Sequence, residues 1–140
     1  IVQGLRAEGG HAAKPVVVTE AGDLFVNIGS PSNSCQEEDR ETGSPGKDPC
    51  EERETNAGIW RFAADRTDQT MADGRRFAAG MRNTVALARN PLDGALYAAV
   101  HGRDQLHQNW GEMYSAEDGA ERHGENRHQP HHRHHRRAHR

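Results

Sequence analysis

Two short polar stretches contain the side chains best suited to chemistry. His11 follows two glycines, and a neutral imidazole can accept a proton near physiological pH. Arg82 and Asn83 come directly before an apolar run, and a guanidinium binds carboxylates through two parallel hydrogen bonds. The simpler alternatives are a solvated histidine in a glycine loop and a surface turn at Arg82-Asn83. Which alternative holds depends on the elements that position these residues.

The sequence around Arg82 repeats an earlier stretch in the same order. Three pairs of segments match: 1–6 with 77–82, 15–18 with 84–87, and 22–29 with 93–102. Leu24 and Leu96 lie 72 positions apart. A propeller blade repeats at roughly 40–50 residues, and one long polar loop at 29–57 explains the excess. The repeat therefore indicates one blade and the beginning of the next, with Arg82 and Asn83 where a propeller places groups around its channel.

Local patterns predict a meander of short strands. The expected strands are 1–5, 15–19, 24–28, 58–62 and 75–79, with a restart at Thr84. Val16–Val18 is predicted to be buried, and Leu24–Ile28 is predicted to be half-buried. Asp93-Gly94 is typical of a hairpin turn, because glycine adopts positive φ at little cost. Four consecutive strands in meander order are the unit of a propeller blade.

The composition argues against a large core. Hydrophobic residues make up 33% of the 140 residues and aromatic residues 5%, whereas a typical globular chain is roughly 45–50% apolar. No apolar run is long enough to span a membrane, and no signal peptide follows Ile1. We interpret the chain as a fragment that begins within a blade. Residues 1–120 are expected to form a partial propeller, and the His/Arg-rich residues 121–140 a disordered, low-complexity tail.

The two cysteines lie in the polar loop at 29–57. Cys35 and Cys50 can form only one disulfide. In an exported protein, a bridge that closes a loop of about 15 residues would stabilise the fold by roughly 3 kcal/mol. In a reducing compartment, both residues would be free surface thiols. The residues alone leave both alternatives open.

With these motifs the chain resembles the soluble quinoprotein sugar dehydrogenases, the aldose, glucose and sorbosone dehydrogenases that use pyrroloquinoline quinone (PQQ). The motifs are Gly9–His11, Lys14–Val18, Asp23–Ser30, Gly80–Asn83 and His101–Asp104. Each is weak alone, and their order and spacing carry the resemblance over residues 1–120. It implies an all-β fold, a fragment of a six-bladed β-propeller with about one four-stranded blade and parts of its neighbours. It also implies a periplasmic or secreted protein, which favours the disulfide.

The resemblance implies a role for each motif residue. His11 corresponds to the base that removes the proton from the anomeric hydroxyl of the sugar while hydride moves to the quinone. Arg82 and Asn83 correspond to the pair that binds the carbonyl and carboxylate groups of PQQ. Gly102 and Arg103 occupy the positions whose backbone carbonyls bind Ca²⁺, a hard cation that accepts oxygen ligands.

The expected function is therefore PQQ-dependent oxidation of a sugar, with an external electron acceptor and no membrane or specific nucleic-acid partner. About four blades are missing, so the fragment is expected to be inactive alone. The alternative is a noncatalytic β-propeller module that binds carbohydrate or protein. Asp104 is interpreted as structural, either paired with Arg103 or orienting its neighbours. The tail can be read as a metal-binding or nonspecific nucleic-acid-binding segment, although a frame change near Ala120–Glu121 explains its composition more simply.

Overall fold

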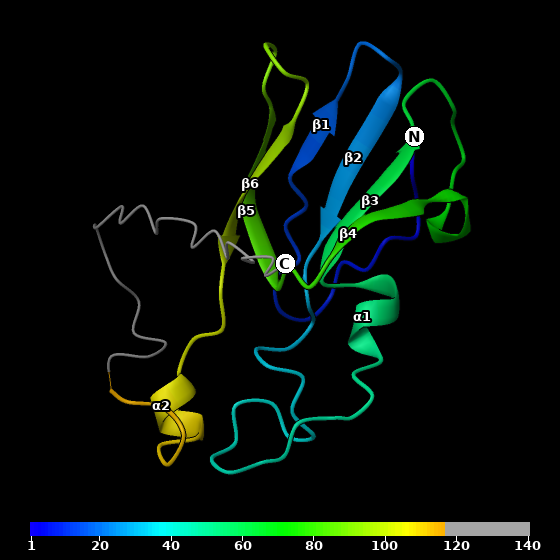
Figure 1. Cartoon of the computed structure of the whole chain (residues 1–140). Coiled ribbons are helices and arrows are strands. Elements are labelled where there is room, and N and C mark those ends of the chain that lie inside the picture. Colours follow the sequence, from blue (N-terminus) through cyan, green and yellow to red (C-terminus); the bar gives the residue numbers. More distant parts are fainter. Residues whose placement is uncertain (117–140) are drawn as a thin grey trace, which may run out of the picture.

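The computed structural model describes residues 1–116 as two antiparallel sheets with short helices beside them (Figure 1). The elements are β1 (Val16–Val18), β2 (Asp23–Ile28), α1 (Glu52–Thr55), β3 (Gly58–Ala63), η1 (Met71–Asp73), β4 (Arg75–Ala79), β5 (Asn83–Arg89), β6 (Leu96–His101) and α2 (Leu106–Asn109). Strands β1 to β4 form one sheet in sequence order, and β5 pairs with β6. The predictions of an all-β chain and of a four-stranded meander are confirmed. These two sheets do not close into a ring.

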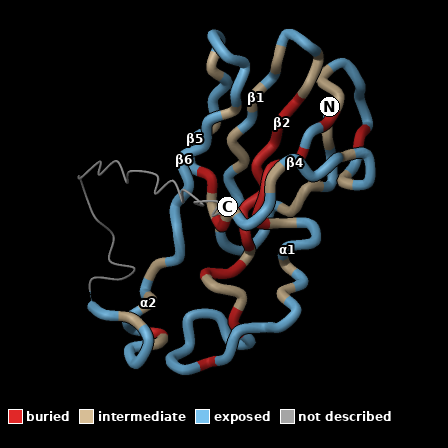
Figure 2. Tube along the Cα trace, in the orientation of Figure 1, coloured by how far each residue is buried: buried red, intermediate tan, exposed pale blue. Residues whose placement is uncertain are grey.

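The core lies where β2 and β3 pair. Leu24 is opposite Phe62 and Val26 is opposite Trp60, so these side chains share one face of the sheet. Together with Ile28 they form one apolar cluster. The partly buried residues that pack against this cluster are Val2, Leu5, Ala64 and Met71. Figure 2 shows that buried residues follow β2 and continue into the segment after it.

The opposite face of β2 is buried as well. The ring of Phe25 meets that of Phe77 edge to face, with centroids 4.8 Å apart, and Asn27 and Ile59 are almost completely inaccessible. Strand β5 lies against β1 and β2 and contributes to this burial. The prediction that Leu24–Ile28 is half-buried is therefore wrong, because the strand is covered on both faces.

Strand β1 is more exposed than its sequence suggests. Val16 is 55% exposed and Val18 is 61% exposed, although three consecutive valines predict a buried strand. β1 is an edge strand of its sheet, and both valines point to the same side of it. The prediction of a buried strand here is wrong, because an edge strand has a neighbouring strand on one side only and both valines stay largely exposed.

The N-terminal segment does not form the predicted strand at 1–5. Val2 makes only an isolated bridge to Gln69, and the amide of Gln3 donates to the carbonyl of Gln69 at 2.9 Å. The backbone therefore pairs with a turn rather than with a strand, while Val2 and Leu5 still reach the core. At the other end, the predicted tail at 121–140 and the frame change near Ala120–Glu121 lie outside the described residues.

The hairpin predicted at Asp93-Gly94 is confirmed. It joins β5 to β6, and Gly94 has a φ of 73°. The amides of Gly94 and Ala95 donate to the backbone carbonyl of Asn90 and the side chain of Asp93 respectively, both at 2.9 Å. No helix among the described residues combines the length and apolar character needed to cross a bilayer.

The long polar loop at 29–57 is ordered by its own contacts. The side chain of Gln36, 1% exposed, donates to the carbonyls of Glu41 and Ser44 and accepts from the amide of Arg40. The segment that follows β6 docks on this loop, since the indole of Trp110 donates to the Ser44 carbonyl at 3.3 Å. Loop and α2 lie together below the sheets in Figure 1.

Candidate functional site

A cavity of about 320 Å³ lies between the long loop and the end of the second sheet. Three of the residues predicted from the sequence line it: Arg82, Gly102 and Arg103. The remaining lining residues are Ser30, Asn33, Ser34, Cys35, Cys50, Glu52, Arg53, Ala57, Gly80 and Val100. Its volume is within the range of roughly 300–1,000 Å³ that is usual for small-molecule sites.

Arg82 is the buried cation of this cavity, with 8% of the residue exposed. Its Nε donates to the carbonyl of Asn33 at 2.9 Å, and its Nη1 donates to the carbonyl of Gly102 at 2.6 Å. Its Nη2 forms an ion pair with Asp104 at 2.9 Å. Burial lowers the pKa of the guanidinium, and Asp104 opposes that shift. The side chain therefore ties the long loop to the end of β6.

Asp104 also connects the long loop to the end of β6, a contact that the sequence analysis did not predict. Its carboxylate binds Arg82 and also Arg40 of the long loop. Burial acts to raise the pKa of Asp104, but the two arginines more than offset this effect and hold it below its ordinary value. The suggested pairing of Asp104 with Arg103 does not occur. The guanidinium of Arg103 instead lies over the ring of Tyr114, 5.9 Å from its centre.

Asn33 is a site residue that the sequence analysis missed. It is 2% exposed, and its side chain donates to the carbonyl of Asp104 at 2.8 Å and accepts from the amide of Asp104 at 3.1 Å. Nothing in the surrounding Ser-Pro-Ser-Asn-Ser run distinguishes it from an ordinary turn asparagine. Its role depends on a partner 71 residues away.

His11 lies beside the cavity rather than in its wall. Its Nδ1 is 2.7 Å from the carbonyl of Ser30, which is a lining residue. A carbonyl can only accept, so Nδ1 carries the proton and a neutral ring has its lone pair on Nε2. The backbone of Arg82 reaches the same residue, because the amide of Ser30 donates to the Arg82 carbonyl at 2.7 Å. The structure thus brings His11 and Arg82 together at Ser30.

Asn83 and Gly102 are placed less favourably for their predicted roles. Asn83 begins β5 opposite His101 and does not line the cavity. The carbonyl of Gly102, a predicted Ca²⁺ ligand, accepts a hydrogen bond from Arg82. A cation at this carbonyl would lie against the guanidinium.

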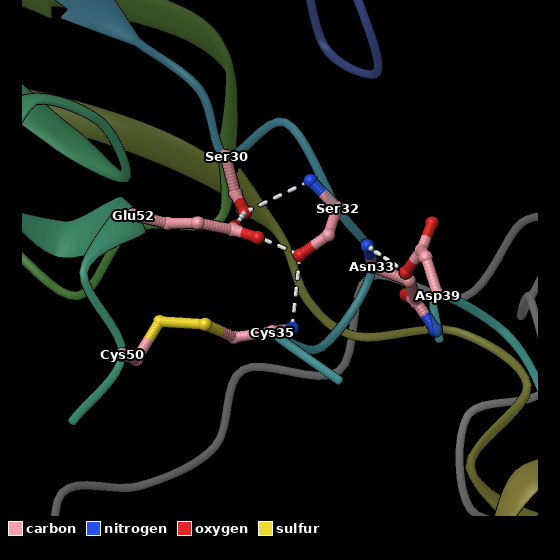
Figure 3. The surroundings of a disulfide bond; sticks show 7 residues. All are labelled: Ser30, Ser32, Asn33, Cys35, Asp39, Cys50 and Glu52. Carbon is pink, nitrogen blue, oxygen red and sulfur yellow. Dashed lines mark hydrogen bonds between the residues drawn. A yellow bond between two sulfur atoms is a disulfide. The ribbon is translucent and has the colours of Figure 1, made fainter. Parts of the chain in front are cut away.

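The opposite wall of the cavity contains a disulfide and a carboxylate. The bond between Cys35 and Cys50 confirms the predicted pairing (Figure 3). The hydroxyls of Ser30 and Ser32 donate to Oε2 of Glu52 at 2.7 and 2.8 Å. The Ser32 hydroxyl also accepts from the amide of Cys35 at 2.9 Å. Glu52 and the disulfide are therefore held by one hydrogen-bonded network.

Comparison with known proteins adds no relative to this description. No protein-family model, no curated protein and no solved structure matches the chain. The functional argument therefore depends on the sequence motifs and on the geometry of the cavity.

Proposed function

We propose that this chain is part of a PQQ-dependent sugar dehydrogenase and that the cavity holds the quinone. The observation that supports this proposal is the placement of Arg82, Gly102 and Arg103 around one cavity, with His11 bonded to the lining residue Ser30. Segments far apart in the sequence, and assigned to one site by motif alone, lie within reach of a single ligand.

The residues of the cavity fit a polycarboxylate such as PQQ in their charge. Arg53 and Arg103 line it beside Arg82, whose own donors bind within the chain, and guanidinium groups bind carboxylates with good geometry. Glu52 is the opposing charge, and two serine hydroxyls bind one of its oxygens. Ca²⁺ does not fit this arrangement, because the Gly102 carbonyl accepts from Arg82. Calcium binding stays a prediction that requires this carbonyl to exchange Arg82 for the ion.

In this proposal the chain positions and deprotonates the substrate. Bound PQQ supplies the hydride acceptor. Arg103, whose guanidinium stacks on Tyr114, orients a carboxylate of the quinone. His11 removes the proton from the sugar hydroxyl through Nε2, because Nδ1 is committed to the Ser30 carbonyl. That hydrogen bond fixes the tautomer and the orientation of the ring.

Quinone binding by the chain itself is the direct test. Titration with PQQ, followed by tryptophan fluorescence or calorimetry, should show saturable binding that Arg103→Gln weakens at least about tenfold, the value of one charge-assisted hydrogen bond. Arg89→Gln, an exposed position on β5, is the matched control and should leave the affinity unchanged. Absence of saturable binding, or equal affinities of the two variants, would overturn the quinone site.

Catalysis requires a protein in which this segment is joined to further blades, since residues 1–116 form two unclosed sheets. In such a protein, His11→Ala should abolish dye-linked sugar oxidation while PQQ still binds. Retained oxidation would show that His11 is not the base.

A noncatalytic propeller module is the second candidate. The contacts of Arg82 favour it. Its guanidinium already binds Asn33, Gly102 and Asp104, so it acts as a structural link and not as a ligand-binding group. This candidate predicts carbohydrate or protein binding without any dependence on quinone. The PQQ titration separates the two candidates.

A further inference from the structure

The wall of the cavity contains three potential metal ligands. The Sγ atoms of Cys35 and Cys50 and a carboxylate oxygen of Glu52 all lie within 4.8 Å of one another. Among the described residues, this is the one group of three or more His, Cys, Asp or Glu side chains arranged in this way. All three residues are partly buried. In the disulfide form the two sulfurs are bonded to each other, so neither is a thiolate.

We propose that reduction of the Cys35–Cys50 disulfide converts this group into a binding site for a soft or borderline divalent cation such as Zn²⁺. The site shares the cavity that we propose for the quinone, but the inference does not depend on quinone binding. Two thiolates and one carboxylate are a donor set that Zn²⁺ accepts, with a fourth position open to water. Two Zn–S bonds of about 2.3 Å at a tetrahedral angle place the sulfurs about 3.8 Å apart, so the two sulfurs, bonded to each other in the disulfide, must move apart to bind the ion.

The positions of the two cysteines do not depend on the disulfide alone. The amide of Lys47 donates to the carbonyl of Cys35 at 2.8 Å, and Gln36 forms a bridge with Gly46. The buried side chain of Gln36 adds three hydrogen bonds within the same loop. The loop therefore keeps Cys35 near Cys50 when the S–S bond is cleaved, which pre-organises the ligands.

Glu52 is already oriented as a third ligand. Its carboxylate lies next to the disulfide, and the hydroxyls of Ser30 and Ser32 both donate to Oε2 (Figure 3). Neither serine occupies Oε1. Hydrogen bonds from neighbouring groups to a ligand carboxylate fix its direction, which is the usual support of a protein metal site.

The charges around the group are balanced by its surroundings. Two thiolates and a carboxylate carry three negative charges, and a divalent cation leaves one. Arg53 and Arg103 line the same cavity and offset this remaining charge, whereas the charge of Arg82 is already paired with Asp104. The reduction and the metal binding balance in atoms and electrons. A phosphine and water convert the disulfide into two thiols and a phosphine oxide, and the cation then displaces two protons from the thiols.

Cobalt(II) is the appropriate probe because its bonds to sulfur give a charge-transfer band that imidazole ligands do not. This distinction matters because seven of the ten histidines of the chain lie in 121–140, and imidazoles can bind divalent cations without thiolates. Titration of the whole chain with Co²⁺ under anaerobic conditions, after reduction by a phosphine, should give this band at one ion per chain. The disulfide form should give none, and Zn²⁺ should displace the cobalt.

Two variants test the ligand set. Glu52→Gln keeps an acceptor for the serines but removes the charged ligand, and should weaken the affinity for Co²⁺ at least about tenfold, since even indirect changes at metal sites cost roughly that much. Glu54→Gln, exposed on the same short helix, is the matched control and should bind as the wild type does. Cys35→Ser should abolish the band.

Two results would overturn the proposal. One is the absence of the band in the reduced wild type. The other is equal affinity of the Glu52→Gln and Glu54→Gln variants, which would mean that the thiols bind the ion without the folded site. Circular dichroism of the reduced chain distinguishes a folded site from binding by an unfolded loop, and binding by an unfolded loop also counts against the proposal.

Discussion

His11 and Arg82 both form hydrogen bonds with the backbone of Ser30, one with its carbonyl and the other with its amide. The side chain of His11 contacts the carbonyl of Ser30 at 2.7 Å, and the carbonyl of Arg82 accepts the amide of Ser30 at 2.7 Å. Two loops that each precede the first strand of their sheet are thus joined through the segment that leaves β2. The position of the candidate base and the position of the buried guanidinium are therefore coupled mechanically.

Gly29 makes this close approach possible. A Cβ at this position would lie 2.7 Å from the Cβ of His11 and 3.3 Å from the carbonyl of Arg82. We expect Gly29→Ala to lower the free energy of unfolding by about 1–3 kcal/mol, as overpacking does, and to displace His11. Urea denaturation measures the first effect and the histidine NMR signals the second. Gly46→Ala, whose nearest neighbour would be 4.0 Å away, is the control. Equal stability of the two variants would contradict the expected crowding.

The ion pair of Arg82 with Asp104 should contribute more to stability than an exposed pair. Asp104→Asn removes the charge opposite a guanidinium in a residue that is 8% exposed, and should cost about 2 kcal/mol. Asp23→Asn is a close control, because its carboxylate is similarly accessible but its partner, Arg61, is 54% exposed. That variant should stay within about 1 kcal/mol of the wild type. A larger loss for Asp23→Asn would refute the assignment.

The same aspartate predicts how stability depends on pH. Ion pairs with Arg82 and Arg40 hold the pKa of Asp104 below its ordinary value, although burial opposes them. The associated stabilisation is fully present above the pKa of aspartate in the unfolded chain, about 3.9, and is lost as the pH falls through the lower folded-state pKa. Thermal melts from pH 7 to pH 2 should therefore show a smaller acid-induced loss in Asp104→Asn than in the wild type. Parallel curves would be inconsistent with this linkage.

Asn27 is the clearest site for a stabilising substitution. It is completely buried on β2, and neither polar atom of its amide has a hydrogen-bond partner among the described residues. Replacing it with leucine, which has the same branched shape and the same number of side-chain heavy atoms, removes an unsatisfied group and should raise the free energy of unfolding by about 1–2 kcal/mol. Asn27→Asp should be strongly destabilising, because it buries an unpaired charge. A loss of stability in Asn27→Leu would indicate that the amide binds a partner.

The disulfide should stabilise the fold without being required for it. The Cys35→Ser/Cys50→Ser double variant removes a bridge between residues 15 apart and should lose up to about 3 kcal/mol. The loss should be smaller than this upper value, since the hydrogen bonds of Gln36 still hold the loop. Chemical reduction of the wild type should give the same loss in urea denaturation. An unfolded double variant would show that the loop has no structure of its own.

The sequence by itself determined the four strands of the first sheet, their order and the turn between β5 and β6, although it also predicted a strand at 1–5 that does not form. These features depend on neighbouring residues: apolar and β-branched runs bounded by turn residues, and a glycine after Asp93 that adopts positive φ. The disulfide was also predictable as a pairing, since only Cys35 and Cys50 are available. The family resemblance predicts one site for Arg82, Gly102 and Arg103, and in the structure all three line one cavity.

The tertiary structure alone decided which faces are buried and which groups Arg82 binds. The valines of β1 are exposed and β2 is covered on both faces, because burial depends on what packs against a strand and not on its own composition. Asn33 and Asp104 reach Arg82 from 49 and 22 residues away. A local sequence pattern does not show which distant residues will meet, so the contacts of Arg82 with Asn33 and Asp104 arise only when the chain folds.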